Sequence, residues 1–201
     1  MHGKPWRLET MRIGEVVQAS TQEFTAQCYE LHQPPPFASL VRTREGETDI
    51  FAVVYHAETG PLEPGRRPVA RGREETEEEG VYRAHPQLSR LLRTEFRAWI
   101  VGHRVEGKLV QALSPRPPKL HSFVFLAKTE EIGEFGSSLH FLGPLATAPL
   151  PPREELIPAF LLHLAGSRED RGEFLLRAGK ELTLLLRGEV PRLQSLLRRL
   201  S

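Results

Sequence analysis

The chain has 201 residues, of which 39% are hydrophobic and 26% charged, a composition typical of a folded protein and too apolar for global disorder. Its 27 basic and 26 acidic residues leave a net charge of +1, which disfavours a protein whose main task is to grip nucleic acid electrostatically. The single Cys28 excludes an internal disulfide, and no run of about 18 apolar residues is present to span a membrane, so we expect a cytoplasmic protein.

Short apolar runs typical of β-strands dominate the N-terminal part of the chain. Alternating, β-branched or aromatic residues predict strands over 13–19, 24–31 and 37–42. The run 50–55 is almost continuously apolar, which indicates a strand that is covered on both faces.

A segment rich in Pro, Gly and charge follows and predicts a long surface loop over 58–80. Its basic cluster, Arg66, Arg67, Arg71 and Arg73, stands directly before the acidic run 74–79. The cluster either binds a phosphate or an acidic partner surface, or pairs with the acidic run. Exposed ion pairs contribute only about 0–1 kcal/mol each, so pairing alone is a weak reason for the cluster, and we prefer partner contact.

Beyond the loop, leucines at helical spacing predict a short helix over 86–95. Strands return over 98–103, 109–113 and 121–126, and the first two are joined by a hairpin connection at 104–108. Six or seven short strands predict a closed barrel or a compact sandwich. A closed barrel also removes exposed sheet edges.

From Lys128 onward we expect helices. Thr129 with the following acidic residues resembles a helix start, although Gly133 and Gly136 weaken it. Apolar stripes predict further helices over 152–164, over 169–187 and from Pro191 onward. Apolar residues outside the stripe of 169–187 imply a second neighbour for this helix, which we place within the chain in preference to another subunit; they are Leu176, Leu184 and Leu186.

The predicted fold is therefore α+β: a small N-terminal antiparallel β-barrel at 1–127, followed by a helical C-terminal segment at 128–201. The barrel region includes the long charged loop 58–80 and the short helix 86–95.

The opening of the chain resembles the first strands of the HAS-barrel family. The pattern of that family is a Gly followed by two apolar strand residues, a Ser/Thr turn and a Phe in the second strand, matched here by Gly14, Val16, Val17, Ser20, Thr21 and Phe24. Segments 65–72, 85–96 and 115–124 extend the similarity to a stand-alone, largely cyanobacterial group in which the barrel precedes a helical tail. HAS barrels are shared by HerA-type DNA-translocating ATPases and the catalytic subunits of ATP synthases.

The chain departs from its ATPase relatives in lacking their phosphate-binding loop. That loop ends in Gly-Lys-Ser/Thr, because backbone amides cradle the phosphates while the Lys and a hydroxyl hold charge and magnesium. Here the Gly-Lys pairs are followed by Pro5, Leu109 and Glu181. The resemblance thus implies a barrel without a motor, used as a docking or oligomerisation surface.

Few residues in the sequence suggest catalysis. His103 ends one predicted strand and His121 begins another, so both are candidates for the barrel rim, and no paired Cys/His/Asp spacing accompanies them to favour a metal site. Cys28 is expected to pack in a strand as a small apolar side chain. We therefore expect no catalytic residues and no cofactor.

Three functions stay open on the sequence. The preferred one is a non-catalytic interaction or oligomerisation module that docks on or caps a partner assembly, through a protein partner or self-association. The second, which rests on the resemblance, is an accessory factor in HerA-type DNA processing, and the third is an unrecognised hydrolase. Direct nucleic-acid binding is not favoured, because the net charge is near zero and aromatic residues make up only 7%.

Overall fold

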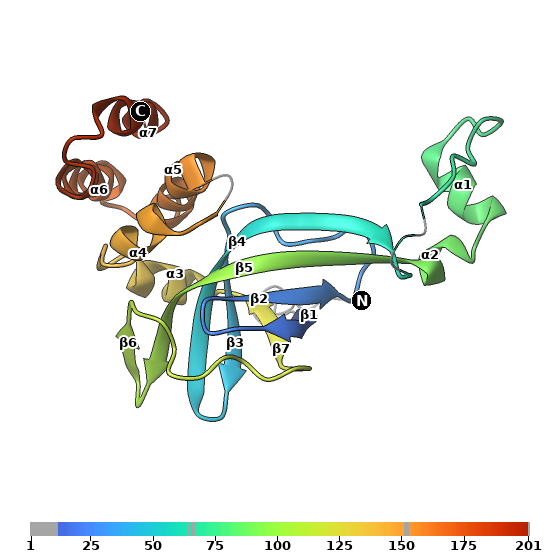
Figure 1. Ribbon diagram of the computed structural model, residues 1–201, viewed down its shortest axis with the longest axis horizontal. Helices are drawn as coiled ribbons and strands as arrows, with labels where there is room; N and C mark the ends of the chain where they lie inside the picture. Colours follow the sequence, from blue (N-terminus) through green and yellow to red (C-terminus); the bar gives the residue numbers. More distant parts are fainter. Residues whose placement is uncertain (1–11, 64, 66, 151–152, 201) are drawn as a thin grey trace, which may run out of the picture.

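The structure, a computed structural model, describes residues 12–63, 65, 67–150 and 153–200 (Figure 1). The strands of this part of the chain are β1 (Arg12–Ala19), β2 (Glu23–Cys28), β3 (Leu40–Glu45), β4 (Thr48–Pro61), β5 (Leu92–Val105), β6 (Lys108–Val110) and β7 (Phe123–Leu126). Its helices are α1 (Glu78–Ala84), α2 (Leu88–Leu91), α3 (Thr129–Phe135), α4 (Leu142–Thr147), α5 (Arg153–Ala165), α6 (Arg171–Leu185) and α7 (Val190–Arg198).

Six of the strands close into an antiparallel barrel. The sheet order is β2–β1–β7–β3–β4–β5–β6, and the additional pairing of β2 with β5 joins the two sides of the ring. Glu23 lies opposite Trp99 and Gln27 opposite Glu95 along this closing seam. β6 stays outside the ring as the hairpin partner of β5. The predicted α+β fold with a closed barrel is confirmed, and the sandwich alternative is excluded.

Alternate positions along the strands fill the barrel interior, as in other small barrels. The residues of this inner core are Val16, Phe24, Ala26, Cys28, Val41, Ile50, Ala52, Val54, Phe96, Ala98, Ile100 and Val124. Within the run 50–55, the other alternate set, including Phe51 and Val53, belongs to a second core outside the barrel. This strand is therefore covered on both faces, as its continuous apolar run predicts.

The second core joins the outer faces of β4 and β5 to the C-terminal helices (Figure 1). Its centre is an aromatic cluster in which the ring of Phe135 lies 6.1 Å from Phe51, 5.5 Å from Phe141 and 6.1 Å from Phe160. The backbone amide of Leu40 in β3 donates to Nε2 of His163 in α5 at 3.4 Å, and burial lowers the pKa of this histidine. The helical segment and the barrel thus fold against each other across one continuous apolar interface.

The helices predicted from apolar stripes are present. In α5 the stripe Leu156, Ile157, Phe160, Leu161 and Leu164 is fully buried. α3 forms despite Gly133 inside it, because the carboxylate of Glu131 accepts a hydrogen bond of 2.9 Å from the backbone amide of Lys128 and caps the first turn. α6 buries Phe174, Ala178 and Leu182, and α7 begins at Val190.

One prediction about α6 is wrong in part. Leu186 is buried, but Leu176 and Leu184 remain 60% and 65% exposed. The described helices do not cover this side of α6, because α5 and α7 pack on its Phe174–Ala178–Leu182 face.

Several boundaries near the predicted loop also need correction. The helix predicted over 86–95 ends at Leu91, and the residues from Leu92 onward belong to β5. The loop predicted over 58–80 is shorter at both ends, since β4 continues to Pro61 and α1 begins at Glu78. Both strands are longer than their apolar runs because they pair with each other throughout this region.

Candidate functional site

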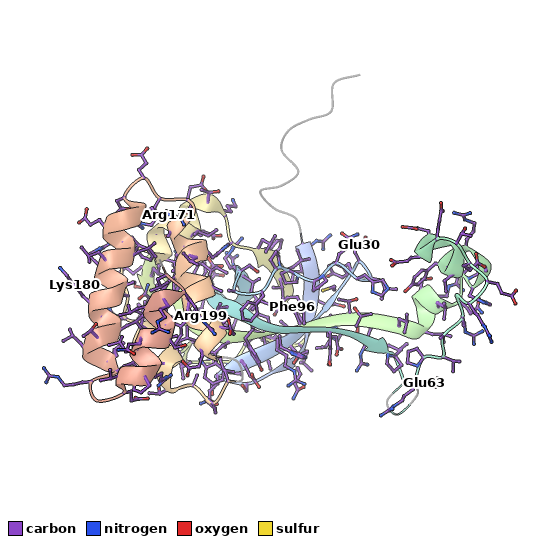
Figure 2. The ribbon with its side chains drawn as sticks, turned by 90° about the horizontal axis from the view of Figure 1, so that it is seen from above. Glu30, Glu63, Phe96, Arg171, Lys180 and Arg199 are labelled. Carbon is purple, nitrogen blue, oxygen red and sulfur yellow. The ribbon has the colours of Figure 1, made fainter. Side chains whose placement is uncertain are left out.

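The most distinctive feature of the molecule is an arm that leaves the barrel (Figure 1). β4 and β5 pair from Asp49 opposite Arg104 to Pro61 opposite Leu92. β5 pairs with β2 only from Glu95 onward, so its residues 92–94 have no β2 neighbour, and β4 has no β3 neighbour after Val53. The last part of the ribbon is therefore two-stranded, and residues 62–91, which include α1 and α2, form a tip at its end. Figure 2 shows the same arm from above, with Glu63 where β4 leads into the tip.

Hydrogen bonds from the loop after β2 hold the arm near its base. The hydroxyls of Thr59 and Thr94 lie 2.8 Å apart across the ribbon. The backbone amide of His32 donates to Oγ1 of Thr94 at 2.8 Å, and the imidazole of His32 is hydrogen-bonded to the hydroxyl of Tyr82 in α1. These contacts fix the direction of α1 relative to the barrel and leave most of the tip in solvent.

The tip exposes apolar side chains beside dense charge. Leu62, Val69, Tyr82 and Leu91 are 46%, 75%, 36% and 37% exposed. Local packing within the tip is slight: the only buried residue of α1 is Gly80, which lies against the side chain of Glu75. The tip therefore exposes aliphatic and aromatic side chains among charged ones.

The predicted basic cluster lies in this tip. Arg67, Arg71 and Arg73 are exposed, and Arg66 lies outside the described residues. Within the described part of the tip, no ion pair joins these three arginines to the acidic run 74–79, since every such pair recorded in the molecule involves other residues. The structure therefore presents the arginines and the glutamates of the tip as separate, solvent-facing charges.

The two rim histidines have different surroundings. His103 in β5 is buried, and its Nδ1 lies 3.2 Å from the backbone oxygen of Ala112, next to the β5–β6 hairpin. His121 has a left-handed backbone (φ 65°), is 78% exposed and lies 3.7 Å from the carboxylate of Glu15. The structure assigns the first to packing and the second to a surface turn, and it gives them no shared partner.

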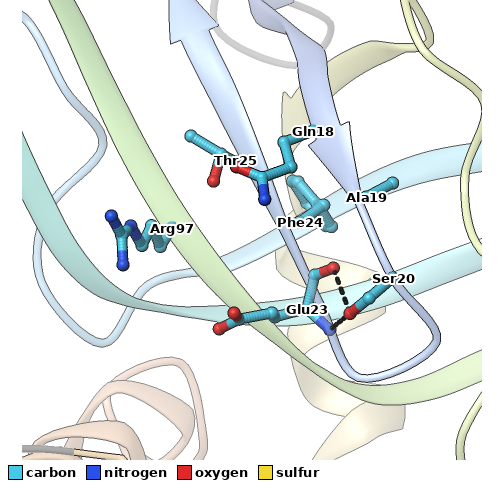
Figure 3. Close-up of a pocket in the computed structure, with 7 residues that line it drawn as sticks. All are labelled: Gln18, Ala19, Ser20, Glu23, Phe24, Thr25 and Arg97. Atoms are coloured by element: carbon cyan, nitrogen blue, oxygen red, sulfur yellow. Dashed lines mark hydrogen bonds between the residues drawn. The ribbon is translucent and has the colours of Figure 1, made fainter.

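A small polar hollow lies where the barrel closes (Figure 3). It has a volume of about 130 Å³ and is lined by Gln18, Ala19, Ser20, Glu23, Phe24, Thr25 and Arg97. The turn beside it is held by Ser20, whose Oγ donates to the backbone oxygen of Glu23 and accepts from its amide, both at 3.1 Å.

A tyrosine beside this hollow bonds to a carboxylate that lines it. The hydroxyl of Tyr55 donates to the carboxylate of Glu23. Burial and this hydrogen bond raise the pKa of Tyr55 to about 12, while Arg97 acts in the opposite direction. The hydroxyl thus keeps its proton at neutral pH. Tyr55, Glu23 and Arg97 link β4, β2 and β5 at the seam.

No model of a known protein family matches this sequence, and no curated protein is similar to it. Among the described residues, no group of three or more His, Cys, Asp or Glu side chains is arranged to hold a metal ion. None of the helices in the described ranges is long and apolar enough to cross a membrane. The similarity to HAS barrels stays a prediction, because a six-stranded barrel identifies no family by itself.

The arm is the structural feature that the sequence analysis missed. A signal for it exists in 93–98, where Arg93, Glu95 and Arg97 alternate with Thr94, Phe96 and Ala98, and the second set is buried. This period of two is typical of a strand. It is masked by Leu88, Leu91 and Leu92, whose spacing fits a helix equally well.

Proposed function

We propose that this protein is a non-catalytic interaction module that uses the arm to contact a further protein, either another copy of itself or an assembly on which the barrel docks. The arm carries this proposal. An isolated two-stranded ribbon is at best marginally stable in water, so a ribbon that leaves a barrel gains stability when a second surface covers it.

The edge of the arm supports the same conclusion. Beyond Val54, no strand of the described chain pairs with the outer side of β4, which continues for seven residues to Pro61. At about 3.3 Å per residue this edge is roughly 20 Å long. Charged side chains on this edge, such as Glu58, disfavour the addition of a strand from another molecule. We therefore place the specific contact with the partner at the tip.

The charges of the tip favour a specific contact. Arg67, Arg71 and Arg73 lie beside five glutamates of the run 74–79 without ion pairs between the two groups in the described residues. Two copies related by a two-fold axis can place the basic part of each tip on the acidic part of the other. A different protein partner would need only a surface complementary to the basic part or to the acidic part of the tip, together with an apolar pocket for Leu62, Tyr82 or Leu91.

Removal of the tip tests this function. Pro61 and Leu92 face each other across the ribbon, so replacing residues 62–91 by Asn-Gly closes the arm as a two-residue hairpin and leaves the barrel unchanged. A matched control, Leu176→Ser with Leu184→Ser, removes comparable exposed apolar surface from α6. Light scattering after size exclusion gives the mass of each protein in solution.

We expect the full chain and the α6 control to associate and the tip-deleted protein to have the mass of one chain. If the full chain is itself monomeric, a photo-crosslinking residue at Val69 should capture a defined protein in the native cell, whereas the same residue at Leu184 should not. A monomeric full chain with no crosslink at Val69 above that at Leu184 contradicts the proposal. If the α6 variant loses association and the tip-deleted protein keeps it, the interface lies on the helices and not on the arm.

A further inference from the structure

A second surface, unrelated to the arm, combines one exposed and one half-buried aromatic ring with cations. β7 lies between β1 and β3 in the barrel, and its alternate residues Phe123 and Phe125 face outward while Val124 is buried in the inner core. Phe123 is 45% exposed. β1 and β7 lie on the side of the barrel away from α5–α7 (Figure 1). We call this surface, formed by Arg12, Arg42, Arg44, Lys119, Phe123 and Phe125, the basic–aromatic face.

The cations of this face are placed against the rings. The guanidinium of Arg12 lies 4.5 Å from the ring centroid of Phe123, and that of Arg42 lies 5.5 Å from the centroid of Phe125. Both distances are within the range of a cation–π interaction. Arg12 is exposed, so its planar guanidinium is also accessible to another planar group from solvent.

A groove runs along the face. It has a volume of about 480 Å³, and its lining includes Arg42, Arg44, Lys119, Phe123 and Phe125. Arg44 and Lys119 are 61% and 74% exposed and form its rim.

Three recessed carboxylates pair with the cations of this groove. Asp49 is 13% exposed and lies 2.9 Å from Arg44 and 3.4 Å from Arg42. Glu45 is 11% exposed and lies 3.5 Å from Lys119. Glu131 of α3 is similarly recessed, beside Arg42. Of these carboxylates only Glu45 lines the groove, while the side chains of Arg44 and Lys119 stay largely exposed although each is ion-paired. On the other flank, Glu15 is 33% exposed and Arg12 is exposed.

From this arrangement we infer that the basic–aromatic face binds single-stranded nucleic acid, with bases stacked on Phe123 and Arg12 and phosphates bound by Arg44 and Lys119. Exposed rings on a barrel surface combined with cations that follow a backbone are the requirements for binding single strands without sequence preference. Duplex nucleic acid does not fit this chemistry, because its bases are stacked on each other and are not free to contact Phe123. The near-neutral net charge of the chain is compatible with such a site, because the charges that matter are local.

Fluorescence anisotropy with a labelled oligothymidine of about 16 nucleotides, the upper end of the site size of a small barrel, tests the inference on the full chain. We expect saturable binding at low salt that is at least about tenfold tighter than binding of a duplex of the same length. Phe123→Ala should weaken binding by about tenfold, which corresponds to about 1.4 kcal/mol. Phe37→Ala is the matched control, because Phe37 is also 45% exposed but lies in the loop before β3, and it should leave the affinity unchanged.

The salt dependence separates phosphate contacts from stacking. Each phosphate neutralised on a single strand contributes about 0.7 to the slope of log affinity against log salt, so Arg44→Ala with Lys119→Ala should reduce the slope by about 1.4. Arg83→Ala with Arg90→Ala, which removes two exposed cations from the tip, should not. Phe123→Ala should lower the affinity and leave the slope unchanged.

Three outcomes would overturn the inference. The first is the absence of any anisotropy change at low salt and micromolar protein. The second is an equal loss of affinity in Phe123→Ala and Phe37→Ala, which would remove the role of stacking. The third is equally tight binding of a labelled polyglutamate peptide, which would show a site for acidic protein segments instead. The tip-deleted protein should bind the oligonucleotide normally, so failure here is distinguishable from failure of the arm to associate.

Discussion

Gly14, the first residue of the family-like pattern, lies where β1 approaches β2 most closely. A Cβ atom at this position would stand 2.1 Å from the backbone oxygen of Gln27, 2.9 Å from its carbonyl carbon and 3.1 Å from Cα of Cys28. All three atoms belong to the backbone of β2, so no side-chain rotation relieves the clash. Gly14 also lies opposite Val124 in β7, which restricts movement of β1 in the other direction.

The substitution Gly14→Ala should therefore destabilise the barrel. The carbonyl of Gln27 would have to recede by about 1 Å to reach an ordinary contact, and this strains the β1–β2 ladder within a closed ring. Overpacking of this kind costs about 1–3 kcal/mol, and the loss of chain freedom in the unfolded state offsets less than about 1 kcal/mol of it. We expect the free energy of unfolding to fall by about 2 kcal/mol and the melting temperature by about 4–8 °C.

Denaturant titration of the full chain measures this loss, with Gly60→Ala as the matched control. Gly60 is also a strand glycine, but a Cβ atom there meets nothing within 4 Å, so its substitution should be neutral or slightly stabilising. If Gly14→Ala and Gly60→Ala unfold within about 0.5 kcal/mol of each other, steric exclusion of a side chain at Gly14 is refuted.

Two further changes probe the cores. Phe135 lies at the centre of the aromatic cluster between barrel and helices, so Phe135→Ala should lower the free energy of unfolding by about 3–5 kcal/mol in a denaturant titration. The exposed control Phe37→Ala should change it by less than about 0.5 kcal/mol. Similar losses for the two variants would refute the central role of the cluster. Burial, with a smaller contribution from Glu95, raises the pKa of Cys28 from 9.0 to about 11, so its thiol should react slowly with a disulfide reagent at pH 8 until the protein unfolds. Since the folded pKa is above the unfolded one, stability should fall between pH 9 and 11, and a Cys28→Ala variant that shows the same fall would assign it to other groups.

The parts of the fold that were predictable are those whose secondary structure follows from the pattern of residues close together in the sequence. The stripe of α5 repeats at helical spacing and is fully buried, and the run 50–55 packs on both sides as its lack of polar residues requires. The hairpin connection predicted over 104–108 is present, narrowed to a two-residue turn in which Glu106 and Gly107 both adopt positive φ.

The candidate site was predictable only as a composition. The basic cluster and the acidic run could be read from the sequence, but not that a ribbon carries them away from the barrel. The basic–aromatic face combines residues from β1, β3 and β7 with a loop, and Arg12 and Phe123 stand far apart in the chain. No local spacing brings such residues together, because the closure of the barrel makes β7 a neighbour of β1.

The sequence by itself determined that this chain forms short strands followed by leucine-faced helices, because periods of 2 and 3.6 residues select which side chains can be buried together. That the strands close into a barrel and do not form a sandwich depends on the pairing of β2 with β5, which the tertiary structure decides. Only the tertiary structure decided that residues 92–97 extend as a strand. The spacing of Leu88, Leu91 and Leu92 permits a helix to continue into this segment. The backbone amides and carbonyls of 92–97 instead find partners in β4, about thirty to forty positions earlier, and hydrogen bonds along the ribbon outweigh the weak local preference. The arm, and with it the proposed interface, follows from that pairing.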